Sequence, residues 1–300
     1  MGARGRGRQD VDPIDGAAAG GRAAGGGAAD GGLFGPDSVT WRVHGEPTML
    51  LAGVRALLLQ ALHPLAMAGV AQHSAFREDP WGRLRRTAEY LGAVSYGTTE
   101  QADRAIARVR TVHRAVRGTD PHSGAAYSAD DPELLLWVHC CEVDSFLGVT
   151  RRAGLRLTPA EADRYLAEQQ LLPHRLGVPE EYAVPGSTEQ LAAYFDRVRP
   201  QLRAVPEARE AARFALLPPL PGWVAVLTPA RPTWVGMACT AMALLPPWAR
   251  RMYGLPVPIG ADLAATVSAR AWRTGLELLP DVLTEGPYLR AAKARIAAAR

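Results

Sequence analysis

Residues 134–146 read LLLWVHCCEVDSF, and this stretch decides the fold of the chain. Pro132 near its start, with Asp130 and Glu133 beside it, is typical of a helix N-terminus, where acidic side chains cap free backbone N–H groups. The first half of the helix is apolar on nearly every side, which is typical of a helix that is buried all round. We therefore expect this helix to lie at the centre of a helical bundle.

Helical patterns continue along the chain from residue 47, without an alternating strand pattern or an Asn-Gly hairpin turn. Thr98 with Gln101 forms a capping box, and Gly92 and Gly118 stand where helices are expected to end. A loop is expected between Gly118 and Asp130. Helices are expected over residues 49–62, 64–73, 80–91, 98–117, 132–146, 160–172, 188–202, 207–217, 233–245 and 261–278.

The sequence therefore predicts an all-α fold, a single multi-helix bundle domain of about ten helices that spans residues 33–300. Residues 1–32 are rich in glycine and alanine with scattered arginines, and we expect them to form a disordered tail. The three cysteines, Cys140, Cys141 and Cys239, include no CxxC pair, which argues against a structural zinc site and a disulfide scaffold.

The chain has 300 residues and a formal net charge of +4, and Lys293 is the one lysine among its 34 basic residues. No basic run is interleaved with aromatic residues, so nucleic acid is not expected as a partner. The apolar stretches at residues 223–227 and 233–245 are too short to span a membrane, and the N-terminus does not read as a secretory signal. We expect a soluble cytoplasmic protein, with peripheral membrane contact left open.

One imidazole stands out, at His113 on the apolar stripe of an otherwise arginine-rich helix. At helical spacing it shares a face with Ile106, Val109 and Val116, so it is expected to point where a core residue points. A buried imidazole needs a partner. That partner can be a backbone carbonyl, a carboxylate or a metal ion, and helical periodicity alone does not choose among them.

Arg83, Arg86 and Thr87 lie near one face of the preceding helix, where they can bind an anionic group. Single histidines on separate apolar helices suit haem, which also needs arginines or hydroxyls for its propionates. Histidines that are simply hydrogen-bonded in the core remain the more frequent explanation. The histidines in apolar helices are His63, His73, His113 and His139, whereas His44, His122 and His174 are expected at the surface.

Several short motifs follow one another in a characteristic order. They are Leu62-His63-Pro64, Gln72-His73, Asp79-Pro80-Trp81, Arg83 with Arg86-Thr87, Val112-His113 with Val116-Arg117-Gly118, Tyr127, and residues 131–139, which read DPELLLWVH. In this order and spacing, over roughly residues 40 to 260, the chain resembles the MpaB and rubber oxygenase (latex clearing protein) family.

The resemblance implies an all-α fold that holds haem b and carries out oxidative chemistry with dioxygen. It implies an iron ligand at His113 and cofactor contacts at Arg83 and Thr87. His139 is expected separately, from its position in the apolar central helix, to lie in the core or beside the cofactor. In the rubber-cleaving branch a lysine occupies the distal iron site at the position of Arg86. A guanidinium stays protonated and is a poor ligand, so rubber cleavage itself is not expected here.

These expectations describe a haem b-dependent oxidoreductase, an oxygenase that acts on a small apolar or unsaturated intracellular substrate with dioxygen. Arg83, Arg86 and His73 are expected to orient the oxygen or to accept a proton, and the need for an electron donor is left open. Two alternatives also stay open. One is a haem- or lipid-binding carrier or sensor without turnover, and the other is a cofactor-free helical interaction protein.

Overall fold

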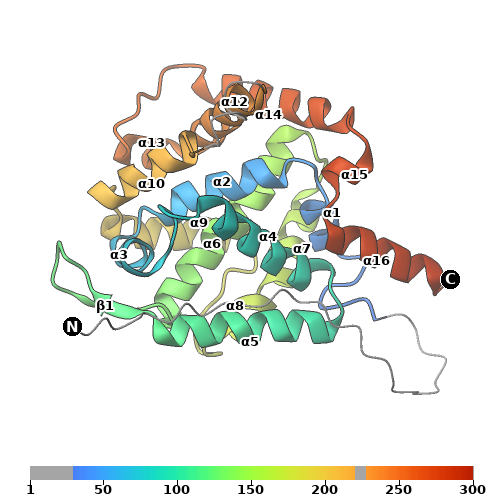
Figure 1. Cartoon of the computed structure of the whole chain (residues 1–300), viewed down its shortest axis with the longest axis horizontal. Coiled ribbons are helices and arrows are strands. Elements are labelled where there is room, and N and C mark those ends of the chain that lie inside the picture. The colour runs from blue at the N-terminus through green and yellow to red at the C-terminus, as the bar shows by residue number, and fades with distance from the viewer. Residues whose placement is uncertain (1–29, 220–227, 300) are drawn as a thin grey trace, which may run out of the picture.

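The computed structural model describes residues 30–219 and 228–299, which are mostly helical (Figure 1). The all-α fold expected from the sequence is confirmed, with more helices than the ten expected. The elements are α1 (Val39–His44), α2 (Met49–Gln60), α3 (Pro64–His73), α4 (Pro80–Tyr96), α5 (Thr99–Ala115), β1 (Arg117–Thr119), β2 (Ala126–Ser128), α6 (Pro132–Ala153), α7 (Pro159–Gln169), α8 (Leu171–Leu176), α9 (Thr188–Val198), η1 (Arg199–Gln201), α10 (Pro206–Leu216), α12 (Ala230–Ala243), α13 (Pro247–Met252), α14 (Ala261–Glu277), α15 (Asp281–Thr284) and α16 (Pro287–Ala298).

Helix α6 lies at the centre of the bundle and packs against α2 (Figure 1). Trp137, Cys140 and Cys141 in its first half have no exposed surface. The central position predicted from the apolar run is therefore confirmed. The two cysteines are small buried thiols, whose pKa values burial raises well above their ordinary range.

The cap of α6 is one residue later than expected. The Asp131 side chain accepts a hydrogen bond from the backbone N–H of Glu133 at 2.9 Å. Asp130 instead forms an ion pair with Arg117 at 3.2 Å, across the two strands that precede the helix. Asp131 directly precedes Pro132, so its side chain is the one that reaches a free N–H of the first turn.

A short β-hairpin lies between α5 and α6, where the sequence predicted a loop (Figure 1). Its strands pair antiparallel, with Gly118 opposite Tyr127. Helix α5 ends at Ala115, so Gly118 is not its left-handed terminus. A Cβ at Gly118 would lie 2.6 Å from the Tyr127 hydroxyl, and the glycine is therefore required for close packing. Strands of three residues are too short to show alternation.

Helix α4 continues through Gly92, where the sequence predicted its end, and stops at Tyr96. A Cβ at Gly92 would lie 2.8 Å from Cδ2 of Tyr288, which belongs to α16. The glycine allows α16 to pack closely across α4. Since Tyr288 is far along the chain, the local sequence could not distinguish this packing role from a helix end.

Asp30, which the sequence placed in the N-terminal tail, contacts the helical bundle. The Asp30 carboxylate accepts hydrogen bonds from the backbone N–H and the hydroxyl of Thr99 at 2.8 and 3.0 Å. Its backbone carbonyl accepts a hydrogen bond from Arg295 Nε at 2.8 Å. The rest of the predicted tail, residues 1–29, lies outside the described residues, as does the apolar stretch at 223–227.

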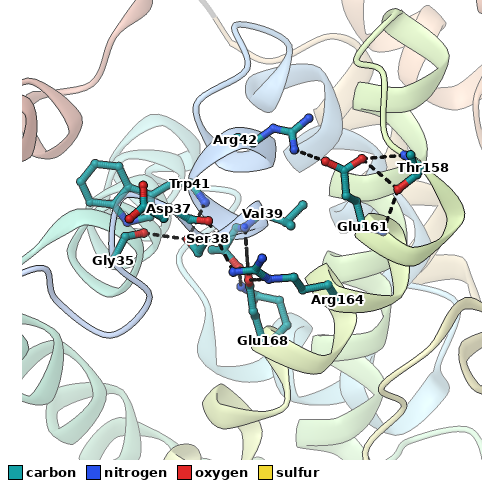
Figure 2. Close-up of polar contacts among 12 residues, drawn as sticks. Gly35, Asp37, Ser38, Val39, Trp41, Arg42, Thr158, Glu161, Arg164 and Glu168 are labelled. Carbon is teal, nitrogen blue, oxygen red and sulfur yellow. Dashed lines mark hydrogen bonds and ion pairs between the residues drawn. The ribbon is translucent and has the colours of Figure 1, made fainter.

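Polar contacts hold α1 against α7 (Figure 2). The Glu168 carboxylate accepts hydrogen bonds from the backbone N–H groups of Val39 and Thr40 at 3.2 and 2.9 Å. These groups have no partner within the first turn of α1, and a negative charge there also interacts favourably with the helix dipole. Arg164 donates to the same carboxylate at 2.9 Å, while Arg42 forms an ion pair with Glu161.

Helices α2 and α3 meet at a sharp bend. Within residues 30–219 and 228–299, no single helix is long and apolar enough to cross a membrane, and these two meet the requirement only as a pair bent by 107°. His63 stands at the bend as the N-cap of α3, but its side chain makes no capping hydrogen bond. Its Nδ1 is buried without a partner in the described residues.

His44 is held inside the protein, and its expected surface position is wrong. Its Nδ1 lies 2.7 Å from Ser95 Oγ, and its Nε2 lies 3.1 Å from the Tyr165 hydroxyl. The ring also packs edge-on against Phe146, with ring centroids 5.2 Å apart. Burial lowers the pKa of His44 to about 4.

This shift predicts an acid-sensitive contribution to stability. The unfolded chain protonates His44 near pH 6.5, whereas the folded protein does so only near pH 4, so stability falls as the pH drops from 6.5 towards 4. We expect a loss on the order of 1 to 3 kcal/mol across this window. Urea unfolding at pH 6.5 and 4.5 measures this loss. The difference in the free energy of unfolding between the two pH values should be smaller in His44→Gln than in the wild type. Identical pH dependence in the two proteins would contradict the assignment.

Candidate cofactor site

Helix α4 presents Arg83, Thr87 and Tyr90 on one face, spaced by four and three residues. The Asp79 side chain caps α4 and so fixes the residue at which the helix begins. The three side chains are partly buried, and Val94 on the same face is only 1% exposed. This face of α4 therefore points into the protein.

Arg83 is half-buried and its guanidinium makes no hydrogen bond or ion pair with any described residue. Burial lowers the pKa of Arg83, and the charge of Arg86 lowers it further. The guanidinium nevertheless stays protonated, so it leaves a positive charge to be neutralised. Arg55 and Arg77, by contrast, pair with carboxylates at 2.8 and 2.6 Å. Arg83 is therefore available to bind an anionic group.

Thr87 lies one turn farther along the same face. Its hydroxyl donates to the backbone carbonyl of Arg83 at 3.1 Å. That bond uses the only hydroxyl hydrogen, so the oxygen in this position can only accept. A carboxylate bound here would require the Thr87 hydroxyl to rotate away from the helix backbone.

His113 lies in the last turn of α5. The capping box of Thr98 and Gln101 is confirmed, and the short connection after α4 makes α5 run back beside it, towards the turn that carries Arg83. The ring is half-buried and makes no hydrogen bond with residues 30–219 or 228–299. Burial lowers the pKa of His113, and Asp130 opposes this shift. The neutral imidazole that results is the form that binds a metal.

Two more titratable side chains, His139 and Glu142, lie three residues apart on one side of α6. His139 is 5% exposed and has no hydrogen-bond partner among the described residues. Burial lowers its pKa to about 3, with a smaller contribution from His174. Glu142 accepts one long hydrogen bond, from Gln60 Nε2 at 3.5 Å, and burial raises its pKa to about 7.

Arg86 and His73 have other partners. Arg86 is exposed and forms an ion pair with Asp79 at 3.2 Å, back towards the start of α4. His73 is exposed at the end of α3, where its Nε2 donates to the backbone carbonyl of Arg117 at 3.1 Å. No hydrogen bond or ring contact in the described part of the chain joins His73 to Arg83 or Arg86.

Sequence reasoning missed Tyr90 and Glu142 as residues of this region. The Tyr90 hydroxyl is buried and has no hydrogen-bond partner in the described residues. Burial raises the Tyr90 pKa, and the charge of Glu142 raises it further. The available signals were the three-residue spacing of Tyr90 from Thr87 and the acidic Glu142 within an otherwise apolar run.

The two best-formed pockets lie elsewhere. One of about 230 Å³ lies between α3, the loop at Asp120 and α10, and the other, of about 180 Å³, lies beside α14 and α15. Neither is lined by His113, Arg83 or Thr87. The described residues contain no group of three or more histidine, cysteine or acidic side chains that would hold a metal ion. A ligand at His113 is indicated by side chains that lack partners, and not by either pocket.

Comparison with known proteins identifies the family. Residues 41–276 match the model of the family described as ER-bound oxygenase mpaB/B'/Rubber oxygenase, catalytic domain. A solved structure of latex clearing protein in the closed state is similar in fold, with a TM-score of 0.55 and 19% sequence identity over 86% of this chain and 72% of that one. A search of the curated proteins finds no significant match. The chain therefore belongs to the mpaB and rubber oxygenase family of oxygenases, as the order of its motifs indicated.

Proposed function

We propose that the protein is a haem b-dependent oxygenase in which His113 holds the iron. One observation carries this proposal: Arg83 on α4, His113 on α5 and His139 on α6 are all buried or half-buried, and none has a hydrogen-bond partner in the described residues. Folded proteins satisfy nearly all buried polar side chains. Arg83 and His113 come from helices that pack against each other, and His139 comes from the central helix. Three side chains without partners therefore support a ligand that supplies them.

The available groups fit haem. A porphyrin already supplies four nitrogen ligands, so its iron needs only one imidazole from this side of the protein. His113, kept neutral by burial, provides that imidazole. Arg83 provides a free guanidinium for a propionate, and Thr87 adds a hydroxyl beside it. His139 provides a second neutral imidazole in the interior.

Haem, when bound, supplies an iron that activates dioxygen for oxidation at or beside a carbon–carbon double bond. The protein's own side chains bind the cofactor, keep water out and move protons. Arg83 holds an anionic group in place, and the apolar residues of α5 and α6 exclude solvent. We retain Arg86 as a hydrogen-bond donor that orients dioxygen and His73 as a group that accepts a proton. For Arg86 this requires release from Asp79, since that ion pair now directs its guanidinium along the surface of α4.

The substrate that we propose is small, apolar or unsaturated and intracellular, with dioxygen as the second substrate. Arg86 stands where a lysine serves as the distal ligand in the rubber-cleaving branch, and a guanidinium does not bind iron. Arg86 would therefore not serve as an iron ligand, and His113 would be the residue that holds the cofactor. Binding of carbon monoxide to the reduced protein would distinguish this oxygenase from a saturated haem carrier.

The test is to express the protein with haem supplied, then measure its optical spectrum and haem-to-protein ratio. We expect a Soret band and about one haem per chain. Arg83→Gln should weaken haem binding by roughly 10- to 100-fold, because it removes a charge-assisted hydrogen bond. Arg85→Gln is the matched control, since Arg85 is exposed on the same helix and pairs with Glu89. Wild-type protein without a Soret band would overturn the proposal.

A further inference from the structure

Large apolar side chains are exposed along the C-terminal part of the chain. Of the twelve large hydrophobic side chains that are exposed in the described residues, eight lie within residues 255–283. They are Leu255, Ile259, Leu263, Val267, Leu278, Leu279, Val282 and Leu283. Exposed apolar residues that are scattered singly are ordinary, whereas a group of them on one part of the surface is typical of a binding site.

Three of these side chains form an apolar stripe, which we call the outer stripe. Ile259 lies in the turn before α14, and Leu263 and Val267 follow at four-residue spacing on the helix, where they are 69% and 59% exposed. The opposite face of α14 carries Ala265 and Ala269, which are buried, and the helix packs on α6 and α12. The outer stripe therefore faces solvent because of the helical phase of α14.

Positive charge lies beside the outer stripe. Arg270 is exposed on α14, three residues after Val267, and it makes no hydrogen bond or ion pair with the described residues. Arg251 on α13 is also exposed and has no such partner there. The ion pair of Arg250 with Asp262, at 2.6 Å, holds α13 against the start of α14. Arg251 is therefore held near the same end of the helix.

The charge balance around the stripe is positive. Arg152 of α6 donates to the Thr266 hydroxyl at 3.0 Å and forms no ion pair with a described residue, so it adds a further cation beside α14. The acidic residue at this end is Asp262, which is already paired. Glu277 and Asp281 lie more than two turns beyond the stripe, at the other end of α14. An anionic partner is therefore favoured over a cationic one.

Apolar side chains flanked by arginines suit a lipid surface. Such side chains enter the boundary between the headgroups and the acyl chains, and arginines reach the phosphates from there. A second copy of this chain suits the surface less well. Arg270 lies one residue from the midpoint of α14, so two antiparallel α14 helices paired along their length would bring two Arg270 side chains together. Like charges that face each other in this way oppose association.

We propose that α14 and the turn before it form a docking surface for an anionic lipid membrane. The outer stripe lies among the headgroups, and Arg251 and Arg270 bind lipid phosphates. In Figure 1 this surface lies at the upper edge of the molecule, away from α5, which carries His113. The inference goes beyond the proposed oxygenase function and does not depend on it.

The test is flotation of the full chain, expressed with haem supplied, with vesicles of phosphatidylcholine alone or mixed with phosphatidylserine. The wild type should bind the mixed vesicles at least about tenfold more tightly than the neutral ones. Leu263→Ser with Val267→Ser should weaken binding to the mixed vesicles at least about tenfold, because it removes apolar area. Arg251→Gln with Arg270→Gln should reduce the preference for phosphatidylserine to about threefold or less.

Arg108→Gln with Val112→Ser is the matched control. Both residues are exposed on α5, and Arg108 forms no ion pair with a described residue, so this variant should bind as the wild type does. All three variants should unfold at the urea concentration of the wild type, because they change exposed side chains.

Three results would overturn the inference. One is a wild type that does not float with the mixed vesicles, and another is a Leu263→Ser, Val267→Ser variant that binds them as tightly as the wild type or the control. The third is a wild-type dimer in sedimentation that this variant converts to a monomer, since a second copy would then cover the stripe. The Soret band of the same samples reports separately on the haem proposal.

Discussion

His113→Ala protein, expressed with haem supplied, is expected to bind haem more than about 100-fold more weakly than the wild type. The loss of a residue that only orients a metal ligand costs about 10- to 100-fold in affinity, so the loss of the ligand itself should cost more. The His113 ring makes no hydrogen bond with described residues, so the substitution removes little else. The readout is the Soret band and the haem-to-protein ratio after gel filtration.

His122→Ala is the control for this experiment. His122 is exposed and pairs with Glu207 at 2.8 Å, away from α4 and α5, so its loss should leave the spectrum unchanged. Addition of imidazole to His113→Gly protein should restore a Soret band, because free imidazole can occupy the vacated position. A His113→Ala spectrum identical to that of the wild type would show that another residue holds the iron.

Arg55→Ala is expected to lower the free energy of unfolding by about 3 to 5 kcal/mol. Arg55 is 6% exposed on α2 and forms an ion pair with Asp144 at 2.8 Å. It also donates to Ser145 Oγ at 2.6 Å and to the backbone carbonyl of Leu244 at 3.0 Å, so one guanidinium joins α2 to α6 and to the end of α12. Its removal leaves a partly buried carboxylate without its cation. Urea unfolding at pH 7 measures the effect.

Two variants determine whether that loss comes from the charge. Arg55→Met with Asp144→Leu removes both charges and should recover most of the stability, since apolar replacements of a buried ion pair are often neutral. Arg85→Ala removes an exposed arginine that pairs with Glu89 on α4, and it should change stability by less than about 0.5 kcal/mol. A loss below 1 kcal/mol in Arg55→Ala would mean that the ion pair does not hold these helices together.

Local sequence was sufficient wherever an element depends on its own residues. The capping box at Thr98 and the start of α3 at Pro64 are formed as predicted, because a cap and a proline act on the backbone beside them. The central position of α6 also followed from its apolar run. Gly92 and Gly118 were misassigned as helix ends, since each instead makes room for a tyrosine from another element.

In the candidate site, too, local sequence was sufficient for some residues and tertiary contacts decided the others. Helical phase was enough to place Arg83 and Thr87 on one face of α4 and His113 on the partly buried face of α5. The same reasoning could not show that Asp79 pairs with Arg86, or that His73 binds the carbonyl of Arg117 at the surface. Both side chains reach partners that their helical phase does not specify.

By itself, the sequence determined the family, the all-α class and the faces of the helices that carry Arg83 and His113, because apolar periodicity and caps act within a few residues. Only the tertiary structure decided which polar groups lack partners. Whether Arg83, Tyr90 and Glu142 are satisfied depends on side chains brought from other helices, and hydrogen bonds and burial are properties of those contacts.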